Sequence, residues 1–122
     1  MMGWHREEAP DDQVRDEAAA QAAAGGDAAL AADLLAALVV ALPDDLARIR
    51  RAVDMGMETE VVEMAHRLRG ATRYCGVPAL DRALAALEQA AGSGADLRVD
   101  MARVDEAARG LMQLVQDLPE RG

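Results

Sequence analysis

The chain has 122 residues, which is enough for one domain with a single hydrophobic core but not for two. It is rich in alanine and has no Phe, one Trp and one Tyr, so packed helices are far more favourable than a sheet. The formal net charge of −9 argues against nucleic acid as a partner, because proteins bind its phosphates with Lys and Arg, and it fits an acidic protein that recognises other proteins.

Cysteine content and hydropathy indicate the compartment. The single cysteine excludes an internal disulfide and suits a reducing environment. The first residues contain no apolar segment typical of a secretory signal. The longest apolar run, residues 34–42, is about half of the ~20 residues that span a bilayer. We therefore expect a cytoplasmic chain without membrane contact.

The N-terminal part divides into a tail and a short helix. Residues 1–12 are polar, contain Gly3 and Pro10, and show no periodicity, so we expect a flexible tail. Trp4 either packs back on the domain or is loosely held, and we expect no function for His5. Residues 13–24 predict a short helix stopped by Gly25 and Gly26, and we place the folded domain at 13–120.

The next helix begins at Asp27, a residue type favoured as an N-cap. Its apolar positions recur at helical steps without a phase break, straight through Pro43: Leu35, Leu38, Leu42, Leu46, Ile49 and Val53. The unbroken phase favours one long helix bent at Pro43. The alternative is a new helix that starts at Pro43 with Asp44 and Asp45 in its first turn.

Three further helices follow, separated by glycine-containing turns. Residues 55–57 form the first turn, Gly76 ends the next helix, and Pro78 opens the one after it. Residues 92–94 break the chain again, and the last helix carries a regular apolar seam at Leu97, Met101, Val104, Ala108, Leu111, Val115 and Leu118. The sequence therefore predicts an all-α fold, an antiparallel four-helix bundle with a short extra N-terminal helix.

His66 lies on the exposed side of the helix that Gly76 ends, the second of the four long helices. The buried line runs through Val61, Ala65, Leu68, Thr72 and Cys75, and His66 is turned about 100° away from it. Gly70 follows one turn later, although Gly inside a helix costs about 0.5–1 kcal/mol relative to Ala. The simplest explanation is steric clearance for an approaching partner. Cys75 is expected in the core rather than as a reactive thiol.

The run His66-Arg-Leu-Arg-Gly70 resembles the His-x-Leu-Lys/Arg-Gly signature of histidine-phosphotransfer (HPt) domains, with Arg69 where Lys is more common. Residues 66–78 are most similar to the C-terminal HPt modules of GacS/BarA-type hybrid sensor kinases, and a weaker resemblance extends over roughly residues 13–118. The resemblance implies a four-helix bundle whose exposed His66 accepts a phosphoryl group from a receiver-domain aspartate and passes it to another receiver.

The residues around His66 suit that chemistry. Arg69 and Arg73, three and seven residues later, can screen phosphoryl oxygens or simply form a solvated, ion-paired face with Glu63 or Asp81. In some family members a polar side chain on the following helix hydrogen-bonds the ring. The matching position here is Glu88, which either orients His66 or is an ordinary surface acid.

The sequence also bears on other possible functions, on cofactors and on the oligomeric state. The Glu63–His66 pair has the spacing of di-iron bundles, but those sites need a second such pair, which this chain lacks. We expect no metal or cofactor on this chain, since the Mg²⁺ for transfer belongs to the receiver, and no autonomous kinase activity. We also expect a monomer, because each helix has one apolar stripe and the bundle uses it. The alternative function is a helical bundle that docks a receiver or helical partner without carrying phosphate.

Overall fold

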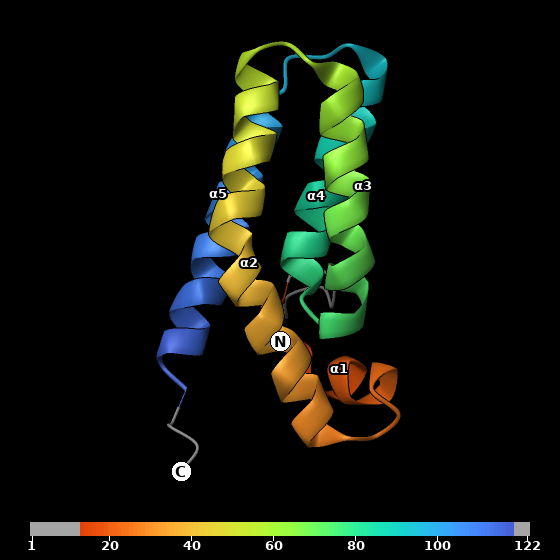
Figure 1. The fold of residues 1–122 in the computed structure, drawn as a ribbon, viewed down its shortest axis with the longest axis vertical. Coiled ribbons are helices and arrows are strands. Elements are labelled where there is room, and N and C mark those ends of the chain that lie inside the picture. Colours follow the sequence, from red (N-terminus) through yellow and green to blue (C-terminus); the bar gives the residue numbers. More distant parts are fainter. Residues whose placement is uncertain (1–12, 119–122) are drawn as a thin grey trace, which may run out of the picture.

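The computed structural model describes residues 13–118 (Figure 1), so the expected flexible tail at 1–12, with Trp4 and His5, lies outside the described residues. The described part contains five helices and no strand. They are α1 (Glu17–Ala23), α2 (Ala28–Asp54), α3 (Glu58–Cys75), α4 (Pro78–Ser93) and α5 (Arg98–Gln116). This confirms the predicted all-α fold.

Helices α2 to α5 run alternately up and down and form the bundle (Figure 1). Each packs on the next along the chain, and α5 also packs on α2, which closes the ring of four. The short α1 packs against α2 and α3 at one end of the bundle. The arrangement is thus the predicted four-helix bundle with one additional N-terminal helix.

The core consists of the apolar faces that the four long helices turn inward. Among the largest side chains that are almost completely buried are Leu42, Ile49, Leu80, Leu84, Leu87 and Leu111. The predicted buried line of α3 is confirmed in full, from Val61 to Cys75, and Thr72 is the one buried polar residue of the described chain. Burial of this apolar surface is the main source of stability for such a bundle.

The first helix is shorter than the prediction of residues 13–24. Helix α1 begins only at Glu17, after Asp16 caps it by accepting a hydrogen bond from Ala19 N at 3.0 Å. Residues before Asp16 are not helical because their main chain bonds to the turn between α3 and α4. Asp16 N donates to Gly76 O at 2.7 Å, and Ala79 N donates to Gln13 O at 2.9 Å. Tertiary hydrogen bonds therefore take precedence over local helix propensity here.

Helix α2 is continuous through Pro43, which confirms one long helix and excludes a new helix starting at that residue. Asp27 caps it as predicted, since its carboxylate accepts from Leu30 N at 3.0 Å. Pro43 is exposed, so the carbonyl that loses its helical partner can meet water. Near the C-terminal end, Ala52 is the buried residue and the expected Val53 is only half-buried.

The corner between α3 and α4 places these two helices side by side. Gly76 adopts the left-handed conformation at φ 63°, which ends α3 in the predicted way, and Pro78 is the first residue of α4. A Cβ atom on Gly76 would lie only 2.8 Å from Ala20 Cβ. Arg15 Nη1 also donates to the carbonyl of Cys75 at 2.7 Å, so α1 and its flanking residues hold this corner.

The last helix ends earlier than the predicted seam. Helix α5 stops at Gln116, Val115 is only half-buried, and Leu118 beyond it is 50% exposed. Leu97 is buried but lies at the N-cap position rather than inside the helix. In the described part, no single helix is both long and apolar enough to cross a membrane, although α1 and α2 taken together reach the length and composition across a 103° bend.

Candidate functional site

His66 projects from the middle of α3 into solvent, with 68% of its side chain exposed. The helix achieves this because Ala65 and Leu68, on either side of His66 in sequence, are buried in the core and fix the rotation of α3. The imidazole therefore sits on a rigid element but remains accessible to another protein.

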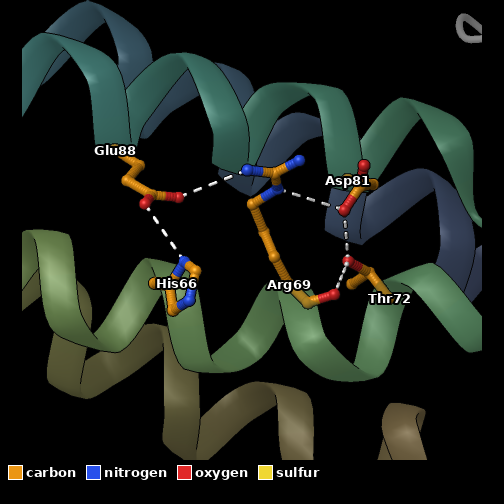
Figure 2. A network of polar contacts seen from close by, with 5 residues as sticks. All are labelled: His66, Arg69, Thr72, Asp81 and Glu88. Atoms are coloured by element: carbon orange, nitrogen blue, oxygen red, sulfur yellow. Dashed lines mark hydrogen bonds and ion pairs between the residues drawn. The ribbon is translucent and has the colours of Figure 1, made fainter.

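Glu88 of α4 contacts the His66 ring across the α3–α4 interface (Figure 2). Its Oε2 lies 3.2 Å from Nδ1 of His66. An ionised carboxylate can only accept a hydrogen bond, so this contact requires the proton on Nδ1. The other ring nitrogen, Nε2, then carries a free lone pair, which is the form of imidazole that acts as a nucleophile.

Arg69 is the second neighbour of Glu88, and its side chain crosses from α3 to α4, where the guanidinium lies between Glu88 and Asp81 rather than over the ring (Figure 2). Its Nη1 donates to Glu88 Oε1 at 3.3 Å, and its Nε donates to Asp81 Oδ1 at 3.3 Å. Partial burial acts to lower the pKa of Arg69, but its hydrogen bonds and ion pairs with Asp81 and Glu88 outweigh this and raise the pKa. Arg69 is therefore an ion-paired cation, 20% exposed, one turn from His66.

The network continues from Asp81 to Thr72, a contact that the sequence analysis did not predict. Thr72 Oγ1 lies 2.7 Å from Asp81 Oδ1 and 3.2 Å from the carbonyl of Arg69. Asp81 had been named only as a possible surface partner of the arginines, and Thr72 only as part of the buried line. The available signal was spacing: Thr72 follows Arg69 by three residues, and Asp81 precedes Glu88 by two helical turns.

Gly70 and Arg73, also on α3, do not belong to this network. Gly70 is exposed, and a Cβ atom built on it meets no atom within 4 Å. Close packing of a neighbouring helix therefore does not explain Gly70. Arg73 is exposed, and its guanidinium makes no hydrogen bond or ion pair with another residue of the described chain. Its side chain is thus available to a partner, and its predicted contact with phosphate stays a prediction.

Other reactive groups lie apart from His66. Cys75 is buried, as expected; burial raises the pKa of its thiol, and Sγ donates to the carbonyl of Leu34 at 3.5 Å. Within residues 13–118, no three side chains of His, Cys, Asp or Glu gather closely enough to hold a metal ion. The site is thus a single exposed imidazole, oriented by one carboxylate and flanked by arginines.

Comparison with known proteins gives the family. The model of the Hpt domain family matches residues 33–120. The chain is 46% identical over 68 residues to the sensor histidine kinase GacS of Pseudomonas protegens and 51% identical over 57 residues to the sensor protein GacS of Pseudomonas syringae pv. syringae. These alignments cover 56% and 47% of this chain but only 7% and 6% of the two relatives.

A solved structure shows the same fold. The crystal structure of the HPT domain from an Hpt sensor hybrid histidine kinase of Shewanella superposes with a TM-score of 0.75, at 22% sequence identity. The superposition covers 88% of this chain and 97% of the Shewanella domain. The chain therefore belongs to the Hpt domain family, whose members are histidine-phosphotransfer modules of two-component phosphorelays.

Proposed function

We propose that His66 is the phosphorylated residue of this chain, accepting a phosphoryl group from a receiver-domain aspartate and passing it to another receiver. The observation that carries this proposal is the geometry of the ring: Nδ1 is held by Glu88 at 3.2 Å, while the side chain is 68% exposed. A ring fixed by one nitrogen and open at the other is suited to attack on a group presented by a second protein.

The transfer itself needs only positioning and charge stabilisation. The lone pair of His66 Nε2 attacks the phosphorus atom of the receiver's aspartyl phosphate, the N–P bond forms, and the P–O bond to the aspartate breaks. The aspartate leaves as a carboxylate, and the imidazole becomes cationic because Nδ1 keeps its proton. The Glu88 carboxylate, in contact with Nδ1, stabilises that positive charge. The reverse steps deliver the phosphoryl group to the next receiver.

The remaining predicted site residues act on the approaching receiver. Arg69 and Arg73 supply positive charge near the phosphoryl oxygens in a chain whose net charge is −9. Gly70 leaves open space one turn from His66, where loops of a receiver can enter. The Mg²⁺ that such transfers require is held by the receiver, so no metal site on this chain is part of the proposal.

Partners and compartment follow from this role. The relatives are a sensor histidine kinase and a sensor protein, and the proposed donor and acceptor are receiver domains of a hybrid sensor kinase or of response regulators. Such exchange takes place in the cytoplasm, with the chain acting as a stoichiometric phosphocarrier. It has no activity as an autonomous kinase in this scheme.

The direct test is labelling with a phosphorylated receiver. The chain is mixed with a receiver domain carrying labelled aspartyl phosphate, and the product is separated and treated with acid and with base. We expect acid-labile, base-stable phosphate on the wild-type chain and none on His66→Gln, with both proteins giving the same helical circular dichroism spectrum, because His66 contributes little to the core. Retained labelling of the variant would refute the assignment. Binding of the receiver without any labelling of the wild type would favour the docking-module function instead.

A further inference from the structure

Glu88 has two oxygen atoms, and each serves a different neighbour (Figure 2). Oε2 contacts Nδ1 of His66, while Oε1 accepts from Nη1 of Arg69. An arginine that faces a carboxylate frequently binds both of its oxygens through two parallel N–H donors. Arg69 does not do so here, and this leaves Oε2 to the imidazole.

The reason lies on the other side of the guanidinium, at Asp81. Nε of Arg69 donates to Asp81 Oδ1 at 3.3 Å, so the guanidinium bridges two carboxylates of α4 that lie two turns apart. Each carboxylate holds one donor of Arg69. With Nε turned toward Asp81, Nη1 is the donor that reaches Glu88, and the guanidinium does not place two donors on both of its oxygens.

Asp81 is in turn held in place by a residue of the core. Its Oδ1 accepts from Thr72 Oγ1 at 2.7 Å, and Thr72 is 1% exposed. A buried hydroxyl needs a hydrogen-bond partner, and a β-branched side chain has few rotamers, so Thr72 is a stiff anchor. The contacts therefore lead without a gap from a buried threonine to the exposed ring of His66.

We propose that Asp81 is a positioning residue for His66: by holding Nε of Arg69, it prevents the guanidinium from closing on both oxygens of Glu88 and so keeps Oε2 on Nδ1. Asp81 touches neither the ring nor a phosphoryl group and acts through Arg69 and Glu88. Its consequence for phosphotransfer rests on the proposed function, because the tautomer protonated on Nδ1 is the one whose Nε2 can attack.

The perturbation is Asp81→Ala. Without Asp81, the partner that remains in the network for Arg69 is Glu88, and the guanidinium turns to bind both of its oxygens. His66 then loses its acceptor and its ring samples both tautomers. Thr72 keeps a partner in the carbonyl of Arg69 at 3.2 Å, so the fold should survive. Asp81→Asn is the second variant: the amide oxygen still accepts from Thr72, but the charge that holds Arg69 is gone.

Ring ¹⁵N NMR of the unphosphorylated chain, at a pH where the ring is neutral, reports the tautomer directly. The chain has two histidines, and His66→Gln identifies which signals belong to His66. In the wild type we expect one protonated and one lone-pair nitrogen with widely separated shifts, the protonated one being Nδ1. In Asp81→Ala and Asp81→Asn we expect the two shifts to converge. Unchanged shifts in the folded variants would overturn the proposal.

The rescue variant separates positioning from a merely structural role. In the double variant Asp81→Ala/Arg69→Ala, no guanidinium at position 69 competes with the His66 ring for Glu88. The two ring ¹⁵N shifts of His66 should therefore be widely separated again. A loss that persists in the double variant would contradict the mechanism. The matched control is Asp105→Ala, which removes an ion pair between Arg50 of α2 and Asp105 of α5, 2.6 Å long and sharing no residue with this network. It should leave the His66 signals unchanged.

Transfer kinetics then connect the tautomer to function. With a phosphorylated receiver, we expect Asp81→Ala to accept phosphate several-fold more slowly than both the wild type and Asp105→Ala. A wild type that accepts no phosphate would refute the proposed function, while the NMR result on Asp81, which needs no receiver, would stand. Converged shifts with an unchanged transfer rate would instead refute the role of Asp81 in transfer.

Discussion

Substitutions at Gly70 should affect the stability of the chain and its phosphotransfer rate in opposite directions. It lies inside α3, its backbone φ is not positive, and a Cβ atom on it meets nothing within 4 Å. An alanine there thus causes no clash within the described chain. Glycine inside a helix costs about 0.5–1 kcal/mol relative to Ala, so Gly70→Ala should stabilise the protein by about that amount. For a domain of this size, that corresponds to a rise in Tm of about 2–4 °C.

The rate of phosphoryl acceptance should fall as the side chain at position 70 becomes larger. Gly70→Gln places a long side chain one turn from His66, in the space that a receiver's loops must enter. A displacement of about 1 Å in a transfer geometry can cost about 100-fold in rate. We therefore expect Gly70→Gln to keep or raise the wild-type Tm while phosphoryl acceptance falls by about tenfold or more, with Gly70→Ala in between.

Thermal melts followed by circular dichroism, together with transfer from a phosphorylated receiver, measure the two effects. Gly110→Ala is the matched control, because Gly110 is also helical, its Cβ would make only an ordinary contact of 3.9 Å with Val14, and α5 packs on α2 and α4 rather than on α3. It should raise the Tm without changing the transfer rate. Wild-type transfer by Gly70→Gln would show that Gly70 does not serve access. A fall in its Tm would show that an unrecognised contact constrains this position.

Three further predictions concern charge, the α3–α4 corner and assembly. If Arg69 screens the phosphoryl group, Arg69→Ala should slow transfer at least several-fold and Arg69→Lys much less, and equal rates in stopped-flow or gel assays would leave it without that role. Gly76→Ala should unfold at a lower urea concentration. Its free energy of unfolding should fall by roughly 1–2 kcal/mol because alanine is strained in the left-handed conformation, and by about 1–3 kcal/mol because its Cβ crowds Ala20. An unchanged urea midpoint would contradict this strain. Sedimentation should show a monomer at micromolar concentration, because the most exposed large hydrophobic side chains within the described helices, Val40, Tyr74 and Val99, belong to three different helices. A stable dimer would refute this.

Most of the bundle could be predicted because its signals are local. The cap at Asp27, the left-handed Gly76 and the opening Pro78 each act within one turn, and the apolar steps of each helix report one buried face. The exposure of His66 follows from the same periodicity. The start of α1 could not be predicted in this way, since it depends on hydrogen bonds to Gly76, 60 residues away in sequence from Asp16.

The polar network was predictable only in part, for a related reason. Glu88 was placed opposite His66 by its match to a family position, and the structure has the two in contact. The sharing of Arg69 between Glu88 and Asp81, however, depends on the register of α4 against α3, and no pattern within either helix determines that register. The prediction that Arg69 points to the phosphate remains a prediction, whereas its ion pair with Asp81 is present.

The network is better suited to orienting His66 than to stabilising the fold. Along α3, exposure falls from 68% at the His66 side chain to 20% at Arg69 and 1% at Thr72, at steps of three residues. Partly exposed ion pairs of this kind contribute about 0–1 kcal/mol each, whereas a buried Leu contributes about 1.5–3 kcal/mol. The core can therefore hold the bundle together without these polar contacts. Because the network is tied to the core at Thr72 and reaches water at His66, substitutions along it should change the ring's tautomer and transfer rate more than the free energy of unfolding.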